Sequence, residues 1–148
     1  MQKIESKNVE YIIIHHSNKI FDHPFLIKLR HKFIRKWDDI GYHFVIGNGV
    51  FTKNGKLFEG RKKDYVGAHC LGYNDKSIGI ALIGNFNYCK PTFKQYRTLI
   101  NLIQSIKKSF PEIKFIIGHN EVTNLKNCPG FFFPLYRFKE LVKRQLNI

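Results

Sequence analysis

Acidic residues are scarce in this chain of 148 residues. Only 11 Asp and Glu stand against 25 Lys and Arg, which gives a formal net charge of +14 at pH 7. Such a charge favours a polyanionic partner, which can be nucleic acid, an anionic membrane surface or an anionic cell wall. Charge alone does not choose among these three classes of partner.

Long apolar runs are also missing. The longest ones are far too short to span a bilayer, which excludes an integral membrane protein. Residues 1–8 are polar and charged, and the apolar run that follows them ends at His15-His16. We therefore expect no secretory signal, and synthesis in the cytoplasm.

Cysteine is rare and odd in number. Cys70, Cys89 and Cys128 cannot form a fully paired disulfide framework, so reduced thiols or metal ligation fit the sequence better. Cys70 and Cys89 could form a disulfide only if the fold brings them within bridging distance, and the sequence does not show that.

The chain also lacks repeats, low-complexity stretches and Pro/Gly/Ser-rich linkers, so we expect a single domain over residues 1–148. Apolar residues make up 43% of it, which is enough for one core. Short runs rich in β-branched or aromatic residues predict strands at 11–15, 42–46, 78–83 and 114–117. Their near-continuous apolar character indicates a sheet covered on both faces.

Helical patterns lie between these strands. An apolar stripe predicts a helix over 93–108, with Thr92 as its N-cap and Phe110-Pro111 as its end. A second helix is predicted to start at Pro134, and a third covers about 25–36. Helices interleaved with strands imply an α/β fold in which a central mixed β-sheet is flanked by helices.

Two segments carry side chains that zinc prefers. His15 and His16 end the first apolar run, and because strand side chains alternate, only one of them readily faces a given metal. His119 ends the run at 114–117, and Cys128 lies in a Lys-Asn-Cys-Pro-Gly loop, a poor place for a core residue. Two imidazoles and a thiolate leave a fourth position for water, which is the layout of a hydrolytic rather than a structural zinc site.

Eight short segments in a fixed order carry the most specific pattern. They are Ile13-Ile14-His15-His16-Ser17, Trp37-Asp38-Asp39-Ile40-Gly41-Tyr42-His43-Phe44-Val45-Ile46, Glu59-Gly60-Arg61, Gly67-Ala68-His69-Cys70-Leu71-Gly72-Tyr73-Asn74, Ser77-Ile78-Gly79-Ile80, Gly84-Asn85-Phe86, Gly118-His119 and Cys128-Pro129-Gly130. Together they resemble the zinc-dependent N-acetylmuramoyl-L-alanine amidases of the type-two fold, a family that includes small phage endolysins and animal peptidoglycan recognition proteins. The resemblance spans nearly the whole chain.

This resemblance implies one catalytic zinc ion and a set of residues around it. The ion is expected on His15, His119 and Cys128, with Tyr42 and Lys126 as catalytic residues that steady the tetrahedral intermediate. Lys126 matches a lysine of the phage enzymes, so it favours a phage-type lysin. The implied reaction is hydrolysis of the amide bond between N-acetylmuramic acid and the first L-alanine of the peptidoglycan stem.

Further cleft residues follow from the same match. His69 is expected to bind substrate or to support a metal ligand, and Asn74 and Arg61 are expected to bind substrate. His16 becomes the partner of the histidine pair that does not bind metal. His43 alternates with Tyr42 along the strand predicted at 42–46, so we expect it to face away from Tyr42 and to be structural.

Bacterial peptidoglycan is the partner that this resemblance implies. Two basic segments of the chain could also bind anionic molecules of the cell wall. Residues 28–36 and the helix containing Arg137, Lys139, Lys143 and Arg144 are candidates for binding anionic wall polymers or lipopolysaccharide, although a plain solvated surface explains either one equally well. We expect His23 and His31, in and near the first segment, to be exposed and without a role. The protein is expected to be a monomer that acts on the bacterial cell wall.

Three rival interpretations remain. A non-catalytic peptidoglycan-recognition protein is the nearest, although a binder would not need the thiolate. A nucleic-acid-binding protein would explain the charge, but the chain has no zinc-finger spacing, recognition helix or aromatic RNA-binding motif. A zinc-stabilised structural domain would need a fourth protein ligand, and none is evident.

Overall fold

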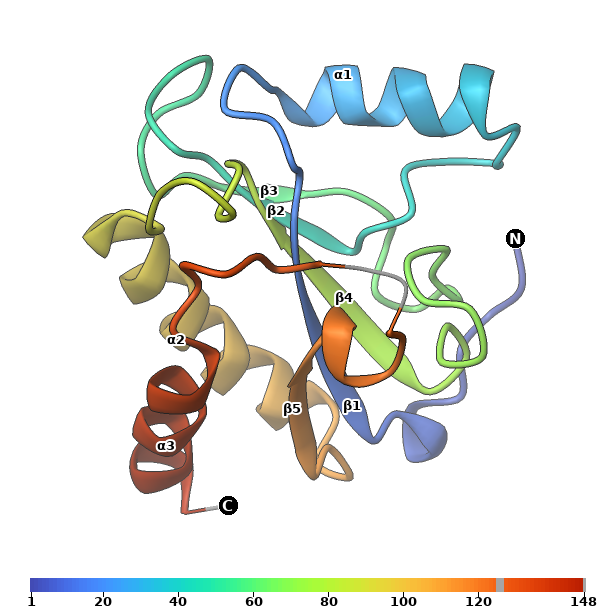
Figure 1. The fold of residues 1–148 in the computed structure, drawn as a ribbon. Coiled ribbons are helices and arrows are strands. Elements are labelled where there is room, and N and C mark those ends of the chain that lie inside the picture. The colour runs from blue at the N-terminus through green and yellow to red at the C-terminus, as the bar shows by residue number, and fades with distance from the viewer. Residues whose placement is uncertain (125–126, 148) are drawn as a thin grey trace.

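A five-stranded mixed sheet forms the centre of the molecule in the computed structural model, which describes residues 1–124 and 127–147 (Figure 1). Its order is β3-β2-β4-β1-β5. The strands are β1 (Tyr11–His16), β2 (Phe44–Ile46), β3 (Leu57–Glu59), β4 (Ser77–Leu82) and β5 (Phe115–Gly118). β1 runs parallel to both β4 and β5, β2 runs parallel to β4, and only β3 is antiparallel to its neighbour β2. The predicted mixed sheet is confirmed.

Helices cover both faces of this sheet. They are η1 (Ser6–Asn8), α1 (Pro24–Leu29), the π-helix η2 (Arg30–Ile34), α2 (Phe93–Ser109), η3 (His119–Glu121) and α3 (Leu135–Leu146). In Figure 1, α2 and α3 lie next to each other, whereas α1 lies apart from them. None of the described helices is long and apolar enough to cross a membrane.

Because strand side chains alternate, the sheet has one face that packs in the main apolar core and an opposite face, here called the cleft face, that is turned toward α1. Ile12 and Ile14 of β1 pack with Leu99 and Ile103 of α2 in the main core. Burying such side chains stabilises the fold by about 1.5–3 kcal/mol each. The opposite face of β4 carries only small side chains, at Ser77, Gly79 and Ala81. This leaves space between the sheet and α1.

The predicted helices are found with small shifts. α2 covers the predicted 93–108 plus one residue, and Thr92 caps it by accepting a hydrogen bond from the Gln95 backbone N–H. α3 starts at Leu135 with Pro134 as its N-cap rather than its first helical residue, a difference of one position. The helix predicted at 25–36 is divided between α1 and the π-helix η2.

The strand predictions miss two features. β2 begins at Phe44, so Tyr42 and His43 precede the strand instead of alternating within it. β3 was not predicted, because Leu57 and Glu59 are exposed and three residues give little periodic signal. Cys70 is buried and Cys89 is exposed, and neither forms a disulfide.

Candidate metal centre and cleft

An open cleft of about 930 Å³ lies between the cleft face of the sheet and the helices α1 and η2. This volume is at the upper end of the usual range for small-molecule sites. His15, Tyr42, His69, His119 and Cys128 are all among its lining residues. The cleft therefore brings together residues from the first, middle and last thirds of the chain.

The sheet register explains why His15 and His119 meet. β1 and β5 are adjacent parallel strands, and Ile14 pairs with Gly118. His15 is the next residue of β1 and His119 directly follows the end of β5, so both lie at the same carboxyl edge of the sheet. Their ring centroids lie 4.6 Å apart.

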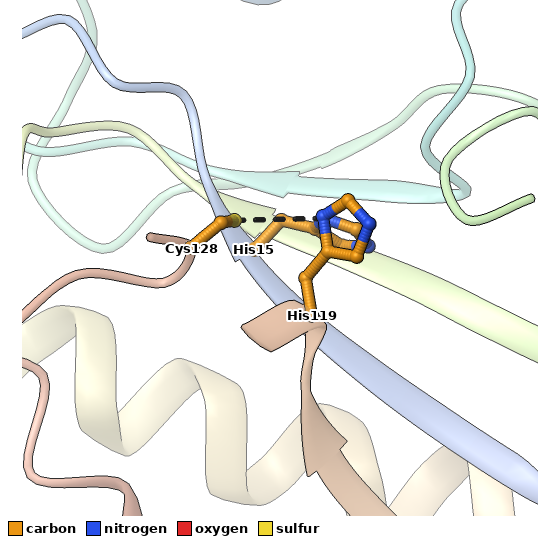
Figure 2. Close-up of side chains that lie close together, drawn as sticks. All are labelled: His15, His119 and Cys128. Atoms are coloured by element: carbon orange, nitrogen blue, oxygen red, sulfur yellow. Dashed lines mark hydrogen bonds between the residues drawn. The ribbon is translucent and has the colours of Figure 1, made fainter. Parts of the chain in front are cut away.

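Cys128 reaches the same place from the following loop. The Asn120 backbone N–H donates to the Cys128 carbonyl oxygen over 2.7 Å, which ties the loop to η3. The Cys128 Sγ lies 3.7 Å from His15 Nδ1 (Figure 2). It also accepts a hydrogen bond from the His16 backbone N–H over 3.3 Å. The thiol thus points at the histidine pair.

These three side chains fit a zinc ion. One ligand atom from each of His15, His119 and Cys128 can be chosen so that all lie within 4.8 Å of one another. Tetrahedral zinc with bonds of about 2.05 Å to nitrogen and about 2.3 Å to sulfur needs a nitrogen–sulfur separation of about 3.6 Å. The 3.7 Å between His15 Nδ1 and Cys128 Sγ already meets this requirement.

Electrostatics also suit a metal ligand at His15. Its side chain is 1% exposed, and this burial, with smaller contributions from His69 and His119, holds its pKa well below the ordinary histidine value. The imidazole is therefore neutral at pH 7 and keeps a lone pair for a metal. His15 thus has the protonation state that ligation requires.

His16 points to the other side of β1. Its Nδ1 accepts a hydrogen bond from the Phe86 backbone N–H over 3.0 Å, and burial lowers its pKa to about 4. Its side chain does not belong to the three-residue metal group found in the described chain. Only its backbone N–H reaches the site, through Cys128 Sγ, a contact that sequence alone could not reveal.

Tyr42 lies beside the metal group. Its ring centroid is 5.1 Å from that of His15. Burial, helped by the nearby Cys128, raises the pKa of the hydroxyl above its ordinary value. The hydroxyl therefore stays protonated at neutral pH and can donate a hydrogen bond into the cleft.

The prediction that His31 is exposed is wrong. Its ring is buried, and its Nδ1 accepts a hydrogen bond from the Gly41 backbone N–H over 2.9 Å. The ring lies 4.7 Å from Trp37 and 5.4 Å from Tyr42, between centroids. His31 thus connects η2 to the segment that carries Tyr42. His23 is half-buried and caps α1 by accepting from the Phe25 backbone N–H.

The prediction that His43 faces away from Tyr42 was based on strand alternation. Tyr42 precedes β2, so that rule does not apply to it, and its side chain packs against the smaller core cluster on the α1 side of the sheet. The His43 ring lies 5.7 Å from that of His69. Its structural role agrees with prediction, because it is fully buried and links the Gly79 N–H to the Tyr65 carbonyl.

The predicted substrate-binding residues have clear structural contacts. Arg61 is buried and donates to the carbonyl oxygens of Ile40, Val66 and Asp39, and it is not among the cleft-lining residues. The Asn74 side chain lines the cleft, and its oxygen accepts from the backbone N–H groups of His69 and Cys70. Substrate contact by either residue stays a prediction.

Lys126 and Glu121 are the charged residues close to Cys128 in sequence, and the structure describes only Glu121. Lys126, predicted to be catalytic, lies outside the described residues. Glu121 accepts from the Gly118 backbone N–H and pairs with Lys139 at 2.7 Å, so it joins η3 to α3. It does not line the cleft.

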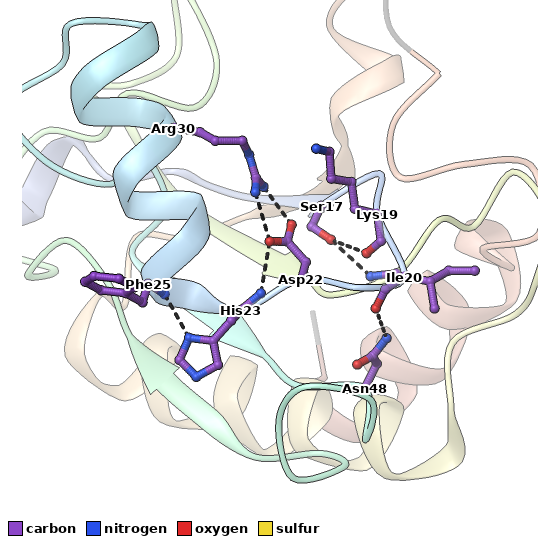
Figure 3. A network of polar contacts seen from close by, with 9 residues as sticks. Ser17, Lys19, Ile20, Asp22, His23, Phe25, Arg30 and Asn48 are labelled. Atoms are coloured by element: carbon purple, nitrogen blue, oxygen red, sulfur yellow. Dashed lines mark hydrogen bonds and ion pairs between the residues drawn. The ribbon is translucent and has the colours of Figure 1, made fainter.

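An ion pair with a fully buried carboxylate holds Arg30, one of the cleft-lining residues (Figure 3). The Asp22 carboxylate is fully buried and accepts two hydrogen bonds from the Arg30 guanidinium, over 3.0 and 2.6 Å. It also accepts from the His23 backbone N–H. The pair fastens the segment after β1 to the start of η2.

Comparisons with known proteins agree with this geometry. The sequence profile described as N-acetylmuramoyl-L-alanine amidase matches residues 5–131. A mouse N-acetylmuramoyl-L-alanine amidase is 38% identical over 104 residues, which cover 68% of this chain and 18% of the mouse protein. An endolysin of an Enterobacteria phage is 32% identical over 100 residues, which cover 64% of this chain and 62% of the endolysin.

A solved structure supports the same assignment. An N-acetylmuramoyl-L-alanine amidase from Clostridium intestinale is similar with a TM-score of 0.83 and 34% identity, over 97% of this chain and 88% of that one. The match to the curated relatives is less complete in length, because the chain spans less than two thirds of the mouse protein and of the phage endolysin.

Proposed function

Because the chain belongs to the N-acetylmuramoyl-L-alanine amidase family, we propose that it hydrolyses the amide bond between N-acetylmuramic acid and the first L-alanine of the peptidoglycan stem. The observation that carries this proposal is the group of His15, His119 and Cys128 on the wall of a large open cleft. Residues 1–148 would then form one catalytic domain.

These three residues would hold one zinc ion. When bound at such a site, zinc activates a water molecule near neutral pH and polarises the carbonyl group that is attacked. The residues themselves would contribute two imidazole nitrogens and a thiolate, and the three side chains line the open cleft that a substrate would enter.

Tyr42 and Lys126 would stabilise the negative charge that develops on the carbonyl oxygen of the substrate. The Tyr42 hydroxyl is suited to this, because its raised pKa keeps it a hydrogen-bond donor and its ring contacts His15. For Lys126 the support for this role is the family resemblance alone. A donor of this kind contributes on the order of 100-fold to 1000-fold in rate.

Asn74 and His69 support the substrate side of the cleft. Asn74 orders the turn at residues 69–70 through two backbone hydrogen bonds, so it can shape the wall that a stem peptide would touch. Arg61 would act more remotely, by fixing the backbone at Asp39, Ile40 and Val66.

The proposal is tested by digesting purified peptidoglycan and identifying the products by mass spectrometry, with zinc quantified in the same preparation. Peptides that begin with a free L-alanine, together with intact glycan chains, are expected, and a chelator should abolish their release. Products cut within the glycan or within the peptide would refute the bond assignment.

A non-catalytic peptidoglycan-recognition protein is the second candidate, because proteins named for peptidoglycan recognition match this chain, among them Drosophila peptidoglycan-recognition protein LB, which is 34% identical over 131 residues. Binding to insoluble wall without release of soluble fragments, with zinc bound in full, would favour it. A phage-type lysin that is made in the cytoplasm and acts on the cell wall is our preferred biological setting. Lys126 and the phage endolysin relative support that choice.

The basic surfaces would increase affinity for anionic wall polymers or lipopolysaccharide. Part of their charge is compensated within the chain, since Lys28 pairs with Asp39 and Arg30 pairs with Asp22. Exposed Lys32, by contrast, has no ion pair among the described residues. Wall binding should weaken as salt rises, and equal binding at low and high salt would contradict this proposal.

A further inference from the structure

His69 joins the metal group to the sheet through hydrogen bonds on both of its ring nitrogens. Its Nδ1 lies 3.0 Å from His15 Nε2, and its Nε2 lies 3.4 Å from Ser77 Oγ. The Ser77 hydroxyl in turn donates to the Tyr73 carbonyl oxygen over 2.6 Å. The contacts form one chain of hydrogen bonds that ends at a backbone carbonyl.

The donor and acceptor chemistry of these groups determines the direction of each hydrogen bond in the series. A carbonyl oxygen only accepts, so the Ser77 hydrogen is directed to Tyr73, and the Ser77 oxygen is left to accept from His69 Nε2–H. In a neutral imidazole the other nitrogen then carries no hydrogen, so His69 Nδ1 accepts from His15 Nε2–H.

At the other end of this series of hydrogen bonds is His15, which would bind the metal. With the hydrogen on Nε2, His15 keeps a lone pair on Nδ1, and Nδ1 is the nitrogen that lies 3.7 Å from Cys128 Sγ. These hydrogen bonds therefore select Nδ1 as the ligand nitrogen of a His15 ring that stays neutral.

Two glycines provide the space for the His69 ring. A Cβ atom added at Gly79 would lie 2.5 Å from His69 Cδ2, and one added at Gly67 would lie 2.6 Å from the same atom. Gly79 lies in the middle of β4, a position at which glycine weakens a strand unless something must approach the backbone closely. Two of the eight family-matching segments, 67–74 and 77–80, thus contribute to one ring-sized gap.

The position of the ring is fixed from its backbone as well. The His69 N–H donates to the Asn74 side-chain oxygen over 2.8 Å, and the side chain is only 7% exposed. His43 packs against the ring at a centroid distance of 5.7 Å. Little freedom remains for His69 to turn away from His15.

We propose that His69 is a positioning residue for the metal ligand His15. The Tyr73 carbonyl, Ser77 and His69 together hold His15 in the Nε2–H tautomer and present its Nδ1 lone pair to the metal. The inference rests on the proposed metal centre and specifies how that centre is prepared before a metal binds.

The first experiment measures the tautomer of His15 in the metal-free protein by ¹⁵N NMR. In the wild type His15 is expected in the Nε2–H form, and in His69→Phe, which keeps a ring but offers no acceptor, a mixture of both tautomers is expected. An Nδ1–H tautomer in the wild type, or no change in His69→Phe, would overturn the proposal.

The second experiment measures zinc affinity by competition with a chromophoric chelator. Loss of such a supporting hydrogen bond typically lowers metal affinity by about 10-fold to 100-fold, which is the drop expected for His69→Phe. His69→Asn, which retains an oxygen acceptor near the position of Nδ1, should recover most of the affinity. Unchanged affinity in His69→Phe, or equal losses in both variants, would refute the proposal.

Two further variants keep His69 in place. Ser77→Ala removes the acceptor of His69 Nε2–H and should shift the His15 tautomer in the same direction as His69→Phe, whereas Ser105→Ala on the exposed face of α2 is the matched control and should leave it unchanged. Gly79→Ala displaces the ring and should also weaken zinc binding. A Ser77→Ala protein indistinguishable from the control would contradict the chain of hydrogen bonds.

Failure of this inference and failure of the proposed function can be told apart. A wild-type protein that binds zinc but leaves peptidoglycan intact would refute the amidase function and leave the positioning role of His69 standing. A fully active enzyme whose zinc affinity is the same with and without His69 would refute only the positioning role.

Discussion

Replacing Arg30 by alanine should destabilise the protein more than replacing its partner Asp22. The two charges are in direct contact, with nitrogen–oxygen distances of 3.0 and 2.6 Å, and Asp22 is 0% exposed whereas the Arg30 side chain is 29% exposed. Arg30→Ala leaves a buried carboxylate without its counter-ion, and Asp22→Ala leaves a cation that can still reach water.

The expected magnitudes follow from this asymmetry. Removing one partner of a buried pair costs about 3–5 kcal/mol, and for Arg30→Ala we expect the lower end, about 3 kcal/mol, because the Asp22 carboxylate keeps the hydrogen bond from the His23 N–H. For Asp22→Ala we expect about 1.5–2 kcal/mol, the lower part of the range for a hydrogen bond to a charged group, because the Arg30 side chain left behind is partly exposed.

Urea unfolding at pH 7 measures both values, provided that the dependence of the free energy on urea is the same for all variants. Glu140→Ala serves as the control, because the Lys143–Glu140 pair is 55% and 41% exposed and should contribute no more than about 0.5 kcal/mol. The reasoning fails if Arg30→Ala lies within about 1 kcal/mol of the wild type, or if Asp22→Ala is the more damaging change.

Three other predictions concern activity and pH. Tyr42→Phe should lower peptidoglycan hydrolysis by about 100-fold to 1000-fold with full zinc content, and a wild-type rate would remove Tyr42 from the mechanism. Lys126→Ala should do the same, and loss of zinc in that variant would instead indicate a role in metal binding. Burial lowers the pKa of both His31 and His43 to about 4, below the value of about 6.5 in the unfolded chain. The unfolded chain therefore binds more protons between these values, and stability should fall as pH drops from about 6.5 to 4, by up to about 1.4 kcal/mol per pH unit for each histidine. Urea unfolding at several pH values checks this, and a flat profile below pH 6.5 would contradict it.

Local patterns were sufficient where a property depends on neighbours in the chain. The apolar stripe and the Thr92 cap predicted α2 to within one residue, because period and capping are local. Alternation in β1 separated His15 from His16, because those residues lie within a regular strand. The same rule does not apply to Tyr42, because Tyr42 precedes β2 and is not part of a strand.

Burial of histidines was the property that sequence predicted least well. His31 sits among basic residues and so suggested an exposed helix, yet it lies in a π-helix and accepts from Gly41. Its surroundings are the Gly41 backbone N–H and the rings of Trp37 and Tyr42, all from the segment that follows η2. Composition around a residue cannot report such a contact.

The sequence by itself determined the types of side chain, the α/β fold and the family, because ligand chemistry and ordered motifs are written along the chain. Only the tertiary structure decided which atoms meet. The register of β1 against β5 places His15 beside His119, and the glycine at position 79 admits the ring of His69. These relations depend on pairing between strands far apart in sequence, and such pairing is a property of the packed molecule.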